Sequence, residues 1–163
     1  MDDLFRELVE VDHDKALRFF VVGLQEVTNR PLNREMVYVA SVLGHYAQTS
    51  RYDMGSMPSL ANLGEVFDNF VIRSIADPEI LEIGGSQIIL FAGFFRDQMK
   101  GRHNVKWYDE VGQSFYSRAS DLSRDQQRRK LFEDLAESLP YWTVRCQALS
   151  RKLSENRFLL KFS

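Results

Sequence analysis

The chain has 163 residues, of which 44% are hydrophobic and 27% charged, and its formal net charge is −2 at pH 7. This length and balance predict a single soluble globular domain over 1–163 and exclude a generic basic surface for nucleic acid. The lone Cys146 cannot form an internal disulfide, and the N-terminus "MDDLFRELVEVDHD" is acidic where a secretory signal would be basic. A cytoplasmic protein of bacterial type is therefore expected.

The first part of the chain predicts two helices joined by a short turn. Apolar residues recur at helical spacing after Asp14 until Pro31, where proline forbids continuation of the helix. Asn33 then opens "REMVYVASVLGHYAQ", which is apolar almost all the way round and is expected to be buried. Residues 49–59, "TSRYDMGSMPS", predict an irregular loop, and Ser59 is expected to cap a further helix.

The centre of the chain carries the strongest helix start. Asp77 is a preferred N-cap, Pro78 suits the first helical turn, and Glu79 complements the positive helix end. A helix from there to about residue 100 would be roughly 34 Å long at 1.5 Å per residue. Its uncharged stretch, residues 83–95, is shorter than the ~20 apolar residues that a membrane span needs. We expect a central core helix over about 78–100 and no membrane span.

Small residues inside this central helix predict close contact with another helix. Gly85 aligns with Ala92, and Ser86 with Gly93, because seven residues make nearly two helical turns. Each glycine costs up to about 1 kcal/mol relative to alanine, so close packing is expected to offset that cost. The alternative occupant of the groove is a small molecule. Gln87 lies on another face, and burial would require that it be hydrogen-bonded.

The last third of the chain predicts further helices. Residues 105–122 share one apolar face and give the clearest amphipathic pattern. The apolar phase of the next segment continues past Pro140 to Leu153, which predicts either one kinked helix or two helices in near register. Its start, "RDQQRRK", predicts an anionic partner or pairing with the acidic first half of the chain. The half-apolar tail over about 156–163 predicts a docking segment or a flexible end.

These elements predict an all-α, single-domain bundle of six to eight helices around the 78–100 helix, because no strand pair or hairpin turn is visible. The stretch "LFAGFF" followed by "YDEVGQSFY", residues 108–116, resembles a pair of helices in a family of small bacterial helical proteins with no assigned activity. The resemblance covers residues 77–119 and transfers no functional residue. It implies that Gly93 and Gly112 are close-contact points between the two helices.

The sequence carries no motif for catalysis, phosphate binding or metal binding. The three histidines lie far apart, so no metal and no cofactor are expected. An enzyme is the least favoured class. The strongest ligand hypothesis is an apolar pocket between helices, in which loop residues would meet aromatic side chains of the central helices. Its residues are His45, Tyr46, Tyr52, Phe91, Phe94 and Tyr108. The alternative is that these side chains only fill the core.

The leading functional hypothesis is a protein-interaction or regulatory module that binds a protein partner or forms a homodimer. Trp107 lies one position off the apolar stripe of its helix, and an exposed tryptophan there would indicate an interface. Apolar residues of the tail, Phe158, Leu159 and Leu160, are the second predicted contact. A small-molecule binder or sensor is the alternative function.

Overall fold

The structure is a computed structural model that describes residues 13–49, 77–99 and 104–162, with side chains described up to residue 155. Within these residues all regular structure is helical and no strand occurs, which confirms the all-α prediction. The elements are α2 (His13–Thr28), α3 (Arg34–Thr49), α5 (Pro78–Ile88), the π-helical η2 (Ile89–Phe94), α6 (Arg96–Met99), α7 (Val105–Leu122) and α8 (Gln126–Phe162). The predicted 49–59 loop and the helix after Ser59 lie almost entirely outside the described residues.

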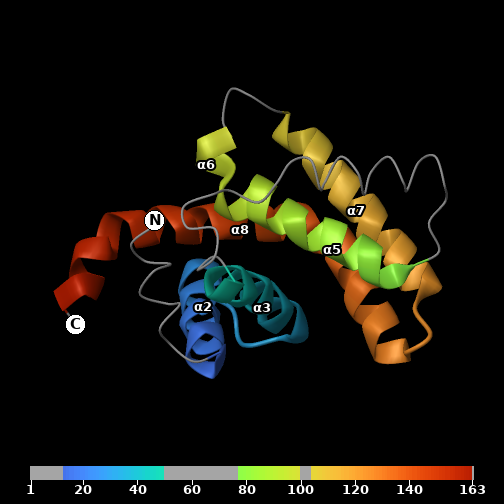
Figure 1. Cartoon of the computed structure of the whole chain (residues 1–163), viewed down its shortest axis with the longest axis horizontal. Coiled ribbons are helices and arrows are strands. Elements are labelled where there is room, and N and C mark those ends of the chain that lie inside the picture. The colour runs from blue at the N-terminus through green and yellow to red at the C-terminus, as the bar shows by residue number, and fades with distance from the viewer. Residues whose placement is uncertain (1–12, 50–76, 100–103, 163) are drawn as a thin grey trace.

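Helix α8 forms the long axis of the molecule. Figure 1 shows α5 and α7 along one side of α8, with the α2–α3 pair on the other. The largest fully buried side chains come from every one of these layers, and Trp142 of α8 is the largest. Within the described residues, no helix is both long enough and apolar enough to cross a bilayer. The core therefore lies where α8, the central helix and the α2–α3 pair converge.

The turn between α2 and α3 follows the sequence signals. Asn29 adopts a left-handed conformation with φ 52°, which ends α2 before Pro31. The Asn33 side chain then accepts a hydrogen bond from the Met36 backbone N–H at 2.8 Å, so it caps α3 as expected. Phe20 and Met36 are among the fully buried side chains that the two helices contribute.

The central helix begins as predicted but is not one uninterrupted α-helix. Asp77 accepts a hydrogen bond from the Glu79 backbone N–H at 2.9 Å and caps α5. The α-helical pattern ends at Ile88, six residues of π-helix follow, and Phe95 bends the chain before α6. The Phe95 N–H bonds the Leu90 carbonyl at 2.7 Å, five residues back, which is the wider π turn. All six η2 residues are buried. The expected α-helix over 78–100 is thus corrected to three segments along one path.

The small-residue groove of the central helix is filled at Gly85 and Gly93 by this chain's own side chains. A Cβ atom added to Gly85 would lie 2.5 Å from the Tyr116 ring of α7. One added to Gly93 would lie 3.0 Å from the Cys146 Cβ of α8. The expected close approach of helices is therefore present, but Gly93 meets α8 rather than α7. Gly112 of α7 contacts both α8 and the central helix, because its added Cβ would lie 2.5 Å from Leu139 and 2.8 Å from Ile88.

Helix α8 continues through its proline. Pro140 lies inside a single helix of 37 residues, so the prediction of one continuous element is confirmed over that of two helices. Figure 1 shows that α8 changes direction along its length, as a proline inside a helix commonly causes. Proline has no N–H to offer the carbonyl of Ala136, four residues earlier, and the Gln113 side chain of α7 binds that carbonyl at 2.9 Å.

Candidate functional site

The predicted ligand residues lie in or beside the core. Phe91 and Phe94 are fully buried, and Tyr108 is nearly so. Tyr46 packs edge-on against Phe95, which in turn packs against Phe94, so these aromatic side chains share one cluster. His45 is exposed, and Tyr52 lies outside the described residues. Three pockets on the described surface are lined by other residues.

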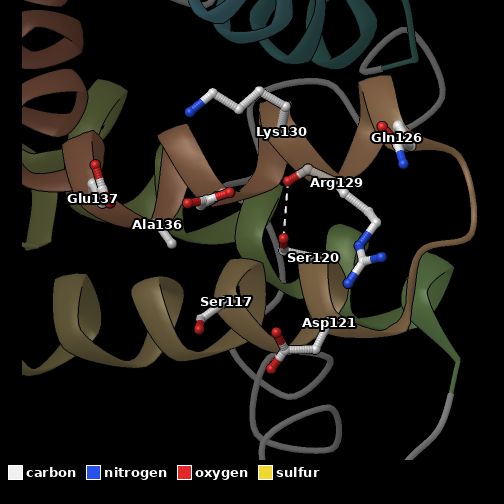
Figure 2. Close-up of a pocket in the computed structure, with 9 residues that line it drawn as sticks. Ser117, Ser120, Asp121, Gln126, Arg129, Lys130, Ala136 and Glu137 are labelled. Atoms are coloured by element: carbon white, nitrogen blue, oxygen red, sulfur yellow. Dashed lines mark hydrogen bonds between the residues drawn. The ribbon is translucent and has the colours of Figure 1, made fainter.

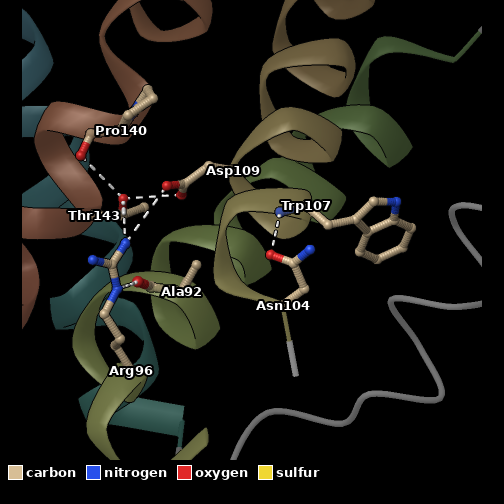
Figure 3. A network of polar contacts seen from close by, with 7 residues as sticks. All are labelled: Ala92, Arg96, Asn104, Trp107, Asp109, Pro140 and Thr143. Carbon is tan, nitrogen blue, oxygen red and sulfur yellow. Dashed lines mark hydrogen bonds and ion pairs between the residues drawn. The ribbon is translucent and has the colours of Figure 1, made fainter. Parts of the chain in front are cut away.

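The predicted interface residue Trp107 stands at the surface. Its side chain is 42% exposed, whereas Trp142, the other tryptophan, is 1% exposed. Trp107 lies in the first turn of α7, where Asn104 caps the helix by accepting the Trp107 backbone N–H at 3.3 Å (Figure 3). Its indole meets the Tyr108 ring edge-on at 5.1 Å. Trp107 is therefore exposed, as the interface hypothesis requires.

The second predicted contact lies at the end of α8. This helix continues to Phe162 and extends past the other described helices in Figure 1. Leu153 is the last of its described side chains to be buried. The backbone of the tail thus continues α8 as helix to Phe162. The side chains of Phe158, Leu159 and Leu160 lie outside the described ones.

A network of polar contacts joins η2 and α6 to α7 and α8 (Figure 3). Arg96 donates to the Thr143 hydroxyl at 3.2 Å and lies 3.5 Å from the Asp109 carboxylate. Thr143 donates to Asp109 at 2.9 Å. Arg96 Nε also donates to the Ala92 carbonyl of η2 at 2.6 Å, so one guanidinium connects the π turn to two helices. No local sequence pattern predicts this network, because its members lie on separate helices.

Burial controls the chemistry of this network. Loss of water raises the pKa of Asp109, and the Thr143 hydrogen bond and the Arg96 charge partly oppose that rise. Cys146 lies nearby, and burial raises the pKa of its thiol to about 12, with a small opposing effect of Arg96. The thiol is therefore protonated at neutral pH and unsuited to act as a nucleophile. The network therefore holds α6, α7 and α8 together.

The short helix α6 has its own contact with α8. The Asp97 carboxylate accepts two hydrogen bonds from the Arg151 guanidinium, at 2.8 and 2.9 Å, and a third from Gln147 at 2.9 Å. A bidentate guanidinium–carboxylate pair fixes the relative orientation of the two side chains as well as their distance. The residues that follow the π turn are thereby held on α8.

A tyrosine pair occupies the junction of α3, α5 and α7. The hydroxyls of Tyr38 and Tyr116 lie 3.1 Å apart and share a hydrogen bond. Burial raises the pKa of Tyr38, and the Glu82 carboxylate adds to that rise. Burial, followed by the neighbouring Tyr38, likewise raises the pKa of Tyr116. Both phenols are therefore neutral at physiological pH.

Two of the four basic residues in the stretch "RDQQRRK" form ion pairs within the described part of the chain. Arg128 forms an ion pair with Glu82 at 2.5 Å, and Lys130 pairs with Asp134 of the same helix at 3.1 Å. Neither acidic partner belongs to the N-terminal 81 residues from which pairing was expected. Exposed pairs of this kind contribute little to stability, so their main effect is to neutralise the basic stretch.

Two surface features lie next to these contacts. An apolar pocket of about 560 Å³ opens between α3 and the start of α8. It is lined by Leu32, Asn33, Arg34, Val37, Tyr38, Ser41 and Leu131. A polar groove runs between α7 and α8, where Ser120 donates to the Arg129 carbonyl at 2.8 Å and the Arg129 side chain extends from α8 toward α7 (Figure 2). Among the described residues, no cluster of His, Cys, Asp or Glu is arranged to hold a metal ion.

Comparison with protein-family models, with curated proteins and with solved structures finds no match.

Proposed function

We propose that this chain is a protein-interaction module that associates with a second copy of itself. The observation that carries the proposal is the 42% exposure of Trp107 on a chain that buries its other tryptophan almost completely. Tryptophan is enriched among the residues that dominate interface energies, because it combines a large apolar area with few rotatable bonds. Its position in the first turn of a well-capped helix gives a partner a fixed surface to bind.

The end of α8 supports the same proposal. The nine residues after Leu153 continue the helix with the sequence "SENRFLLKF", whose second half is rich in apolar residues. Helix propensity alone stabilises a short segment poorly in water, and most helix stability in proteins comes from packing an apolar face. A second chain would supply that packing. We propose Phe158, Leu159 and Leu160 as its contacts.

A cytoplasmic location and a bacterial source are part of the proposal. The one cysteine, Cys146, is buried and free, as suits a compartment in which thiols stay reduced.

Native mass spectrometry of the full chain, together with light scattering, tests the proposal. A dimer would have twice the 19.0 kDa chain mass. We expect Trp107→Ala and Leu160→Asp to shift the equilibrium to monomer. Ile83→Ala is the matched control, because Ile83 is also an exposed large apolar residue, 54% exposed on α5, and its truncation should leave the dimer intact. A wild-type chain that is monomeric at every concentration tested would contradict the proposal.

The second candidate function is a small-molecule binder. The apolar pocket beside Tyr38, with Leu32 and Leu131 on its walls and Arg34 as its one charged residue, favours it. Pockets with apolar walls and few polar groups are typical small-molecule sites. The same mass spectra decide the point: a bound mass that Val37→Trp abolishes would support it, and a bare chain would count against it. The set of His45, Tyr46, Tyr52, Phe91, Phe94 and Tyr108 stays a prediction.

A further inference from the structure

Two positive charges meet one tyrosine ring where α8 passes the end of α2. The guanidinium carbon of Arg30 lies 4.3 Å from the centre of the Tyr141 ring, and that of Arg145 lies 5.0 Å from it. Arg145 follows Tyr141 by one helical turn, and Arg30 follows the left-handed residue that ends α2. The two charges therefore lie within about one Debye length of each other at physiological ionic strength, so they repel.

No carboxylate of the described residues neutralises this pair of charges. The ion pairs in those ranges involve other cations, and Glu26 at the end of α2 binds Lys152. Glu35, the acidic residue closest along α3, accepts hydrogen bonds from Ser138 and Trp142. Arg145 does donate to the Val27 carbonyl at 3.2 Å, and the partial negative charge of a helix end offsets a fraction of one positive charge.

Two polar atoms of the same cluster lack hydrogen-bond partners. The hydroxyl of Tyr141 and the Nε of Arg145 are both buried, and neither makes a hydrogen bond. Such atoms are rare in native proteins, and each one calls for an explanation, of which a bound ion is one. The third such atom among the described residues is Oε1 of Gln87 on α5, a half-buried residue whose hydrogen bonding was expected only in the case of burial. Two of the three therefore fall within one turn of α8.

We infer that Arg30, Tyr141 and Arg145 form a binding site for a small oxyanion, either a carboxylate or a phosphate. A guanidinium presents its donors in a planar fork that matches both anions, and stacking on an aromatic ring leaves that edge available. The Tyr141 hydroxyl adds one further donor. An anion at this position would neutralise the excess positive charge and accept hydrogen bonds from the unpartnered Nε and hydroxyl.

Thermal unfolding of the full chain in sodium phosphate and in sodium chloride at equal ionic strength and pH tests the site. We expect phosphate, at several times its dissociation constant, to raise the Tm of the wild type by about 2–4 °C. Arg30→Gln should abolish most of that rise, and Tyr141→Phe, which keeps the ring, should reduce it. Arg124→Gln removes the same charge from an exposed position before α8 and should leave the rise unchanged.

The variants matter because phosphate also stabilises proteins without binding them. An equal rise in the wild type and in Arg30→Gln would overturn the inference, as would the absence of any rise. A second measurement does not depend on the variants: the side-chain N–H signal of Arg145 should shift and saturate as phosphate is added to labelled protein. An acetate titration reports the class of anion. Saturation with both anions assigns a general oxyanion site, saturation with phosphate alone a phosphate site, and saturation with neither rejects the site.

Discussion

The Gln113 side chain of α7 donates a hydrogen bond to the Ala136 carbonyl of α8 at 2.9 Å, in place of the backbone N–H that Pro140 lacks. The bond repairs the one break that proline makes in the hydrogen-bonding pattern of α8, and it does so from another helix. It therefore couples a local defect of the sequence to the packing of α7 on α8.

Gln113→Ala should lower the free energy of unfolding by about 1–3 kcal/mol, the cost of leaving a partly buried carbonyl without a partner. The cost should be smaller when Pro140 is replaced by Ala, because an alanine N–H at position 140 can bind the Ala136 carbonyl. Urea unfolding of the two single variants and the double variant measures this coupling. Equal costs of Gln113→Ala in both backgrounds would show that the side chain does not serve the proline.

Replacing glycine by alanine should have opposite effects on the free energy of unfolding at two buried positions. Gly85→Ala should destabilise the fold by about 1–3 kcal/mol, because its Cβ would lie 2.5 Å from the Tyr116 ring. Gly44→Ala on α3 should instead stabilise it by up to about 1 kcal/mol, since an added Cβ would find its nearest atom 3.6 Å away and alanine favours helix. Urea or thermal unfolding of both variants tests the pair. If Gly85→Ala left the free energy of unfolding unchanged, the Tyr116 side chain would be able to move away from the added Cβ.

Much of the fold could be predicted because its signals are local. The Asp77 cap, the stop before Pro31 and the amphipathic 105–122 helix each depend on neighbouring residues, and each is present. The π turn could not be predicted in the same way. A π-helical turn holds one more residue than an α-helical turn, so it shifts the spacing of apolar residues along the helix. The stretch "ILFAGF" is apolar throughout, so no such shift can be detected in its sequence.

The polar contacts depend on tertiary structure and were missed for that reason. Asp109 lies 34 residues from Thr143, and only the packing of α7 on α8 brings their side chains together. Arg30 and Tyr141 meet through the packing of α2 on α8 in the same manner. Trp107 is the exception, because the sequence pattern already places it off the apolar stripe of α7. Its exposure in the structure agrees with that position.

The buried thiol gives a chemical prediction. Cys146 is fully buried, and burial raises the pKa of its thiol to about 12, so little thiolate exists at neutral pH. A thiol-specific disulfide reagent should therefore label the native chain no faster than the chain unfolds, and should label it at once in denaturant. Absorbance of the released reagent gives both rates. Rapid labelling of native protein would show that α8 opens around Cys146 without global unfolding.

The raised pKa of Asp109 makes a signed prediction for the pH dependence of stability. Burial disfavours the carboxylate, so the folded chain binds the Asp109 proton more tightly than the unfolded chain does. Stability then rises as pH falls from neutrality through the raised pKa, and this gain is complete below the unfolded value.

Asp109→Asn cannot titrate and still offers Thr143 an acceptor. We expect the wild type to gain stability relative to Asp109→Asn as the pH is lowered from 7 toward 4, measured by urea unfolding at each pH. Asp121→Asn, at an exposed position of α7, is the control for a general charge effect. A difference between wild type and Asp109→Asn that stays constant with pH, or that shrinks as acid is added, would mean that Arg96 and Thr143 outweigh burial at this carboxylate.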